Sequence, residues 1–371
     1  MELALLPPLR RIGLRLAEGI DSTLLVLILI LSMLGLAALF SATYETPARV
    51  LNQLMNLGFA FAAMWLIAQV PPQTLMRFAV PAYAIGIVLL IAVALFGDVS
   101  NGARRWLHVG LTRFQPSEMM KLALPLMLAW YFHKNESTLR LRNFAVAALL
   151  LVVPVALIVR QPDLGTAALV AAVGFCVIFF AGISWRVLGL LGGLGLAALP
   201  LAWSLMHDYQ RRRILTLIDP TQDPLGAGYH IIQSTIAVGS GGPWGKGWLN
   251  GTQSHLEFIP ERHTDFIFAV FSEEFGLIGN LALLTLYALL IARGLMIAGT
   301  AATVFARLLA ASISLMFFTY AFVNMGMVSG ILPVVGVPLP FLSYGGTALL
   351  TLFIGTGILM SVQRHRQLVQ S

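Results

Sequence analysis

The chain has 371 residues, of which 58% are hydrophobic and only 11% are charged. Soluble domains carry about 25% charged residues, so this composition excludes an ordinary soluble domain and indicates a chain that lies mostly in lipid. The net charge of +7 does not indicate a nucleic-acid partner, because membrane proteins collect Lys and Arg in their cytoplasmic loops. The single cysteine, Cys176, lies in an apolar run, which excludes a disulfide framework and a cysteine-based metal site.

The apolar stretches predict about ten membrane helices, since one crossing needs about 20 mainly apolar residues. We expect them at 22–41, 51–70, 75–96, 116–133, 143–160, 164–183, 187–206, 265–292, 305–328 and 344–362. The first follows Arg10, Arg11 and Arg15, and no small-residue cleavage site comes after it, so it reads as a membrane helix rather than a signal peptide. The sequence therefore predicts one all-α integral membrane domain over residues 1–371, with a large outer loop at 206–264 between the seventh and eighth helices.

Basic residues predict the orientation of these helices. With ten spans, one set of basic residues next to the helices falls on one side of the membrane: Arg10, Arg11, Arg15, Lys134, Arg140, Arg142, Arg186, Arg293, Arg364 and Arg366. A second set falls in the long outer loop, which escapes the charge rule because of its length: Arg211, Arg212, Arg213, Lys246 and Arg262. The positive-inside rule makes that side cytoplasmic, with both termini there. Arg104, Arg105 and Arg113 oppose the rule, because they fall in the short outer loop after the third helix. An anionic ligand or the lipid phosphates would explain positive charge at this place.

An irregular stretch interrupts the last part of the chain. Residues 330–346 contain three prolines and several glycines, and nearly all the other residues there are apolar. Irregular backbone at membrane depth is tolerated only against protein or beside a water-filled cavity. We expect this segment to dip towards a cavity and to form part of its wall.

Charged residues open the fourth predicted helix. Glu118 and Lys121 are three residues apart, so they share a helix face and can pair. Ionisable residues near the membrane are costly and usually face an interior cavity. They form either a charged cavity wall or a structural ion pair near the interface.

A polar cluster from Pro260 to Asp265 changes abruptly into the long apolar eighth helix. From Asp265 to Arg293 that helix would measure about 42 Å, which exceeds the hydrocarbon core of about 30 Å. It should therefore tilt or place its first turn at the surface, with Asp265 at the mouth of an outward cavity. Alternatively, Thr264 or Asp265 only caps the helix. Burial would raise the pKa of Asp265, whereas the helix N-terminus or Arg262 would lower it.

Two features further along the chain invite functional interpretations. Glu273 and Glu274 lie two turns into the eighth helix, and we expect interior partners to hold them in a structural role. The glycine-rich stretch 239–247 is not a phosphate-binding P-loop, because Gly247 and not Ser or Thr follows Lys246. We expect a flexible loop with one useful lysine. No His, Cys and carboxylate grouping has the spacing of a zinc site.

Six ordered motifs resemble the SEDS family of polytopic bacterial membrane proteins, over nearly the whole chain. The matching stretches are 101–107, 114–118 with Lys121, 161–166, 223–230, 260–268, and 336–340 with 343–346. The Pro-Glu-Arg-His-Thr-Asp sequence at 260–265 and the short termini resemble the rod-shape branch of the family more than its division branch.

The resemblance implies a peptidoglycan polymerase that joins the disaccharide units of lipid II outside the cytoplasmic membrane and inverts the anomeric configuration. Asp265 matches the catalytic aspartate and would act as the general base. The resemblance also implies substrate-binding residues: Arg105, Trp106, Glu118, Lys121, Lys246, Arg262, His263 and Thr264. The positive side chains would stabilise the charge that develops on the polyprenyl pyrophosphate of the donor glycan. No cofactor is certain, although Mg²⁺ or Mn²⁺ could sit on the pyrophosphate.

Other functions fit some of the same features. A transporter that flips lipid II would also need several helices and a charged cavity, but it should carry polar residues along a path to both faces. A scaffold would need no catalytic carboxylate. The sequence has no Ser-x-x-Lys motif with the accompanying motifs of a transpeptidase. The resemblance therefore implies a class B penicillin-binding protein and other elongation-complex proteins as partners.

Overall fold

The computed structural model describes residues 20–43, 46–100, 103–109, 112–206, 208–223, 226–256, 258–259 and 261–366. Within these ranges ten long helices form the fold, close to the predicted spans. They are α2 (Ser22–Ala42), α3 (Pro47–Gln69), α4 (Pro72–Phe96), α5 (Pro116–Lys134), α6 (Leu141–Val159), α7 (Leu164–Phe180), α8 (Trp185–Leu205), α12 (Ile267–Gly299), α13 (Val304–Val328) and α14 (Thr347–Arg364). The all-α membrane fold is therefore confirmed. Arg10, Arg11 and Arg15 lie outside the described residues.

Seven of these helices, namely α2, α3, α4, α6, α12, α13 and α14, are long and apolar enough to cross a membrane. Leu164–Phe180 and Trp185–Leu201 are shorter apolar helices. Helix α5 is not among them, and it is the helix that carries Glu118 and Lys121. Large apolar side chains are exposed on the helices, for example Phe59 at 75% and Phe96 at 79%. Such exposure is costly in water and suits a surface that faces lipid tails.

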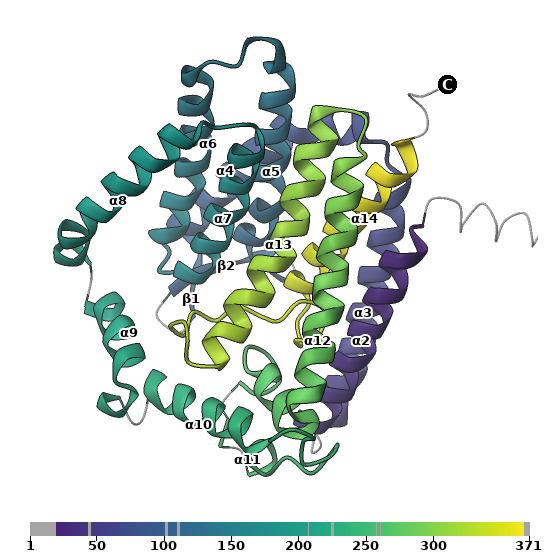
Figure 1. Cartoon of the computed structure of the whole chain (residues 1–371), viewed down its shortest axis with the longest axis vertical. Coiled ribbons are helices and arrows are strands. Elements are labelled where there is room, and N and C mark those ends of the chain that lie inside the picture. Colours follow the sequence, from purple (N-terminus) through teal and green to yellow (C-terminus); the bar gives the residue numbers. More distant parts are fainter. Residues whose placement is uncertain are drawn as a thin grey trace, which may run out of the picture.

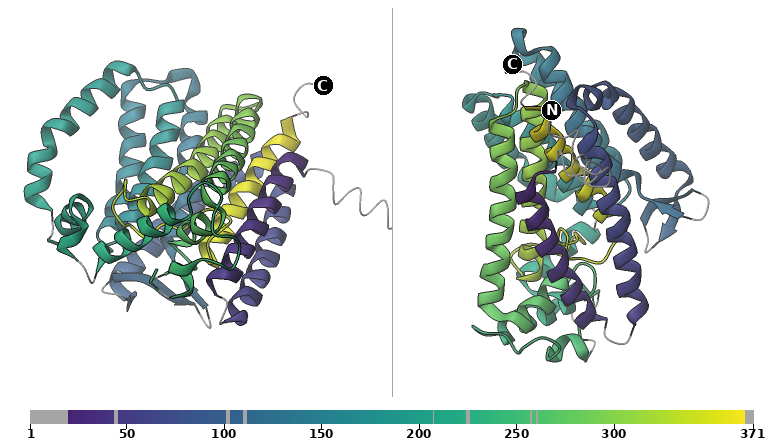
Figure 2. Two further views of the ribbon diagram at one scale, coloured as in Figure 1. Left: turned by 60° about the horizontal axis from the view of Figure 1, so that its bottom comes forward. Right: turned by 90° about the vertical axis from the view of Figure 1, so that its right-hand side faces the viewer.

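The helices run alternately up and down, so the start of α2 and the end of α14 lie at the same end of the bundle (Figures 1 and 2). At the opposite end lie the connecting helices α9 (Asp208–Ile218), α10 (Ala227–Ser240) and α11 (Thr252–His255). We call this the loop end. Two short 3₁₀ helices, η2 (Glu136–Thr138) and η3 (Pro220–Gln222), complete the helical elements of the described residues.

The segment between α4 and α5, which the sequence analysis treated as a loop, forms a small antiparallel sheet. Its strands are β1 (Asp98–Ser100), β2 (Ala103–Val109) and β3 (Thr112–Phe114), with β2 in the middle. Asp98 lies opposite Trp106, and Leu107 lies opposite Phe114. The sheet therefore places the Arg105–Trp106 pair at a fixed position beside the start of α5.

Helix α12 is not continuous, which corrects the expectation of one uninterrupted helix from 265 to 292. Gly276 has φ 64° and ψ −161°, a backbone conformation that only glycine adopts without strain. The break frees backbone groups, and the loop 242–247 pairs with them. The bonds are Lys246 N to Glu273 O (3.0 Å), Gly247 N to Glu274 O (3.0 Å), Leu277 N to Gly242 O (2.9 Å) and Ile278 N to Pro243 O (3.1 Å).

This pairing explains why the loop is rich in glycine. A Cβ on Gly245 would lie 2.1 Å from Glu274 O, and one on Gly276 would lie 2.2 Å from Gly245 N. Two backbone segments can approach this closely only where the residues are glycines, which have no Cβ. The stretch 239–247, which was expected to be a flexible loop, includes the end of α10 and then residues 242–247, which are hydrogen-bonded along the broken helix.

Candidate functional site

A polar cavity of about 320 Å³ lies between α5, α7, α14, strand β2 and two irregular segments, the turn 261–266 and the stretch 330–346. The residues that line it are Arg105, Trp106, Gln115, Glu118, Lys121, Asp163, Thr166, Leu169, Thr264, Asp265, Gly336, Val337, Pro338, Tyr344, Gly345, Gly346, Thr347 and Ala348. The cavity brings together Asp265 and five of the eight predicted substrate-binding residues. It also confirms that the 330–346 segment lines a cavity.

Asp265 lies two residues before the first residue of α12. Its carboxylate has no hydrogen bond or ion pair to any of the described residues, and burial raises its pKa to about 6, with the nearby Glu261 charge as a smaller cause. Desolvation of the Asp265 carboxylate therefore outweighs the helix N-terminus and Arg262, which would both lower its pKa. The N-cap of α12 is Phe266, and no side chain caps it, so the interpretation of Thr264 or Asp265 as a simple helix cap is wrong.

A glycine makes room for this carboxylate. A Cβ on Gly336 would lie 3.2 Å from the Asp265 Oδ2 atom, and Gly336 has a φ of 71° that disfavours other residues. Gly336 therefore lets the irregular segment approach the carboxylate without covering it.

The Glu118–Lys121 pair is buried in the wall of the cavity. Lys121 Nζ lies 2.5 Å from Glu118 Oε1 and also donates to the Tyr320 hydroxyl, and Lys121 is only 1% exposed. The second carboxylate oxygen, Glu118 Oε2, is buried and accepts no hydrogen bond from the described part of the chain. The pair is therefore both a structural ion pair and part of the cavity wall, so the two alternatives for it coincide.

A neighbouring part of the wall is built around Asp163, which was predicted as part of a motif but not as a site residue. Its Oδ1 accepts from Thr166 N (3.2 Å) and caps α7, and its Oδ2 accepts from Gln115 Nε2 (3.1 Å). Arg105 Nε lies 4.0 Å from the same Oδ2, and Arg105 Nη2 donates to Pro162 O (2.6 Å). With a third of its side chain exposed, Arg105 is held at the rim and still presents its charge to the cavity.

Three predicted substrate-binding residues do not line the cavity. Lys246 Nζ lies 2.6 Å from Glu273 Oε1. Arg262 Nε donates to Ala42 O at the end of α2 (2.7 Å). The His263 ring lies against the Tyr344 ring, with centroids 6.0 Å apart. All three therefore lie outside the cavity wall.

Glu273 and Glu274 have the interior partners that the sequence analysis expected. Glu273 is fully buried and also accepts from Thr252 Oγ1 and Gln253 N, while Ser41 Oγ donates to Glu274. Both carboxylates sit directly before the break in α12, so they hold the surrounding loops in place.

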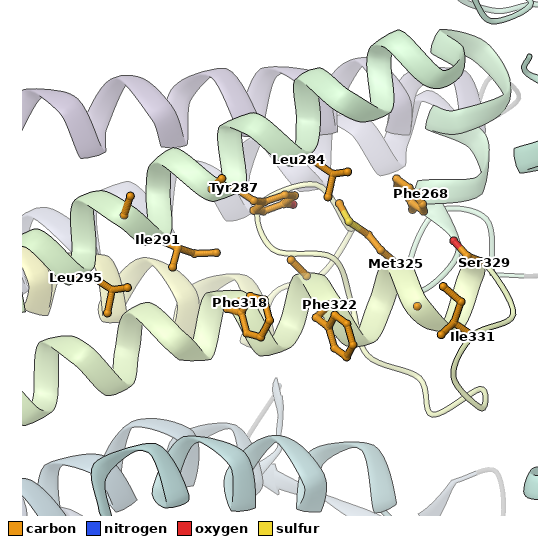
Figure 3. Close-up of a pocket in the computed structure, with 14 residues that line it drawn as sticks. Phe268, Leu284, Tyr287, Ile291, Leu295, Phe318, Phe322, Met325, Ser329 and Ile331 are labelled. Atoms are coloured by element: carbon orange, nitrogen blue, oxygen red, sulfur yellow. The ribbon is translucent and has the colours of Figure 1, made fainter. Parts of the chain in front are cut away.

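In the described part of the chain, apolar grooves also lie on the helices, and two of them are relevant to the site. The larger, about 610 Å³, runs between α12 and α13 and is lined by Phe268, Leu284, Phe318, Phe322 and similar residues (Figure 3). It carries no charged side chain, and the Tyr287 hydroxyl is already bonded to Pro340 O (2.6 Å). The smaller, about 340 Å³, lies between α4, α5 and α14 and shares Glu118 and Thr347 with the polar cavity. The polar cavity is therefore the place for chemistry, with an apolar groove directly beside it.

Comparison with known proteins identifies the family. The family model for FtsW, RodA and SpoVE, described as "Cell cycle protein", matches residues 21–368. The chain belongs to this family. The peptidoglycan glycosyltransferase MrdB of Escherichia coli K12 is 51% identical over 351 residues, which cover 94% of this chain and 95% of that protein. The peptidoglycan glycosyltransferase RodA of Treponema pallidum is 33% identical over 423 residues, which cover 93% and 98%.

Solved structures agree with this assignment. One, described as "Structural coordination of polymerization and crosslinking by a peptidoglycan synthase complex", is 36% identical, has a TM-score of 0.81, and the match covers 94% of this chain and 98% of that one. The crystal structure of the rod shape determining protein RodA of Thermus thermophilus is 31% identical, with a TM-score of 0.72 and coverage of 94% and 97%. The resemblance to the SEDS family and to its rod-shape branch is confirmed.

Proposed function

We propose that this multi-pass inner-membrane protein polymerises peptidoglycan glycan strands from lipid II during cell elongation, with Asp265 as the general base. The relatives named above are peptidoglycan glycosyltransferases, and this family member is an enzyme of the same class. One observation carries the assignment of the base: Asp265 is a partly buried carboxylate without a partner among the described residues, and it lines the polar cavity. The loop end would face the periplasm, with both termini in the cytoplasm.

The proposed step is a direct displacement. The 4-hydroxyl of the N-acetylglucosamine on an incoming lipid II attacks the anomeric carbon of the donor glycan, and Asp265 takes the hydroxyl proton. The bond from that carbon to the pyrophosphate oxygen breaks, and the polyprenyl pyrophosphate leaves with the electron pair. A single displacement inverts the anomeric configuration. A pKa of about 6 keeps Asp265 ionised at neutral pH and still basic enough to accept a proton.

The leaving group needs positive charge near it. Arg105 is the exposed cation at the cavity rim, and Lys121 is the buried one in its wall. We assign the pyrophosphate to the Arg105 side, because a charge that develops in a confined site is stabilised best by fixed positive groups. Lys246 and Arg262 would act only if they left their present partners.

A resident metal ion does not fit the cavity. Among the described residues, no three His, Cys, Asp or Glu side chains come together as a metal site. The carboxylate nearest to Lys121 is already paired with it. The proposed mechanism therefore routes no step through a metal ion.

The polyprenyl tail needs an apolar path that reaches the polar cavity. The groove between α4, α5 and α14 provides one, since it shares Glu118 and Thr347 with that cavity. A lipid-linked sugar could keep its tail in this groove while its pyrophosphate and sugar occupy the polar side. The joined cavity and groove support a lipid-linked substrate.

A partner would complete the wall-building reaction. The related solved structure is described as a peptidoglycan synthase complex that coordinates polymerisation with crosslinking. We propose that this chain assembles with a class B penicillin-binding protein as its transpeptidase, within a larger elongation complex. Failure of the two proteins to co-purify in any mild detergent would count against a stable complex.

The test is polymerisation of lipid II by the purified protein in liposomes, with and without the partner. Asp265→Asn should form no polymer, because the isosteric amide cannot accept the proton. Glu136→Gln is the matched control, since Glu136 is an exposed carboxylate outside the cavity, bonded to His133. Normal polymer from Asp265→Asn would reject Asp265 as the base. Translocation of lipid II by the wild type without any polymerisation would favour the flippase, and normal cell shape with Asp265→Asn would favour a scaffold.

A further inference from the structure

The backbone that carries Asp265 is held at three consecutive residues. The carbonyl oxygens of His263, Thr264 and Asp265 each accept one hydrogen bond. The donors are Tyr344 N to His263 O (2.9 Å), Ser343 Oγ to Thr264 O (2.7 Å) and Asn324 Nδ2 to Asp265 O (2.7 Å). Two of these donors belong to the irregular 330–346 segment and one to α13, so parts of the chain distant in sequence fix three successive peptide groups.

Asn324 connects both irregular segments at once. It is fully buried, and its amide nitrogen also donates to Val337 O (2.6 Å), in the segment that lies beside Asp265. Both acceptors are carbonyl oxygens, so the amide nitrogen and not its oxygen must face them. The Asn324 Oδ1 atom is buried without a hydrogen bond from the described residues. Both protons of the amide are therefore used to join the turn to the 330–346 segment.

Ser343 makes a similar link. Its hydroxyl donates to Thr264 O and accepts from Leu339 N (2.7 Å). Ser343 and Asn324 do not line the polar cavity, so neither would touch a substrate there. The Asp265 carboxylate has no partner of its own among the described residues, and its direction is therefore set by the backbone to which it is attached.

We propose that Asn324 and Ser343 are positioning residues that aim the Asp265 carboxylate at the acceptor hydroxyl. This inference rests on the proposed function of Asp265 as the base. A displacement of the base by about 1 Å can lower the rate of a reaction by about 100-fold. Binding of lipid II should change little, because the cavity wall itself keeps its side chains.

The experiment measures kcat and KM for lipid II polymerisation by purified Asn324→Leu and Ser343→Ala in liposomes. Each variant is normalised to its folded fraction, measured by fluorescence-detected gel filtration and thermal unfolding. We expect kcat to fall by about 10- to 100-fold, with KM within about twofold of the wild type. Ser312→Ala is the control, since Ser312 is also buried on α13 but donates only to Leu309 O of its own helix. It should retain the wild-type kcat.

The pH profile separates positioning from a general loss of structure. If the carboxylate turns away from its buried place, the acid limb of the rate should move towards the ordinary range of an aspartate near 4. Ser343→Ala removes only one hydroxyl and keeps the test valid if Asn324→Leu does not fold. Wild-type kcat and an unmoved acid limb in a folded variant would overturn the proposal, as would a loss of kcat that only follows the folded fraction. If the wild type polymerises and Asp265→Asn does so equally well, the proposed base itself fails, which is a different result.

Discussion

The pH dependence of polymerisation tests the environment of Asp265 most directly. A general base works only in its ionised form, so the rate should follow the ionised fraction of this carboxyl group. Burial, and to a smaller extent the Glu261 charge, raise its pKa from 3.8 to about 6. The rate should therefore rise with pH between 5 and 7 and then level off.

The size of the effect follows from the two pKa values. With a pKa of about 6, about 9% of the carboxyl groups are ionised at pH 5 and about 91% at pH 7. An ordinary aspartate with a pKa of 3.8 would already be about 94% ionised at pH 5. The expected drop is therefore about tenfold between pH 7 and pH 5, whereas an unburied aspartate would give almost none.

The substitution Glu261→Gln assigns this acid limb to Asp265. It removes the nearby negative charge that contributes to the raised pKa of Asp265, while the amide oxygen can still accept the bond from Thr264 Oγ1. Less repulsion favours the ionised carboxylate, so the midpoint of the acid limb should move to lower pH. Initial rates of lipid II polymerisation, measured from pH 4.5 to 8 in buffers of constant ionic strength, give the midpoint.

Glu136→Gln serves as the control, because Glu136 is exposed and lies outside the cavity. It should leave the midpoint unchanged. A rate that is flat between pH 5 and pH 7, or an acid limb that Glu261→Gln does not move, would refute the assignment of the limb to a buried Asp265.

Three further predictions concern stability and the broken helix. Asp265→Asn should unfold at a higher temperature than the wild type at pH 7.5, and its free energy of unfolding should be higher by up to about 3 kcal/mol, because a carboxylate whose pKa is raised on folding destabilises the fold only while it is ionised. This difference should disappear as the pH falls through 6 towards 4. Lys246→Met should destabilise by about 1–3 kcal/mol, because it leaves the buried Glu273 without its cation but with its bonds from Thr252 and Gln253. The double variant Lys246→Met, Glu273→Gln should recover both folding and polymerisation. A double variant that folds but does not polymerise lipid II would show that Lys246 binds substrate. Gly276→Ala should prevent normal folding in a gel-filtration assay, because its Cβ would lie 2.2 Å from Gly245 N.

Much of the fold could be predicted from the sequence. Apolar stretches of membrane length are strong signals, and all ten expected spans became helices. The short sheet before α5 was missed because strands of three to seven residues give weak periodic signals between membrane helices. The break at Gly276 was missed because a glycine inside a long apolar run usually stays helical in membranes.

The site was predicted only in part, for a physical reason. Asp265, Glu118 and Arg105 are ionisable groups in places where charge is costly, so the sequence alone marks them. Lys246 was predicted to bind substrate from the family resemblance, but its partner is Glu273, 27 residues further along the chain. Whether a lysine faces a cavity or a buried carboxylate depends on how the backbone bends, and the bend at Gly276 is a property of the folded structure.

The same reasoning explains why Asn324 escaped notice. An asparagine inside an apolar helix indicates a hydrogen bond but not its partner. Here the irregular turn 261–266 and the irregular segment 330–346 pair with each other and with Asn324. Irregular backbone near lipid would otherwise leave polar groups unpaired at several kcal/mol each. Because these neighbouring backbone groups are satisfied without using the Asp265 carboxylate, that carboxylate remains free for a substrate hydroxyl.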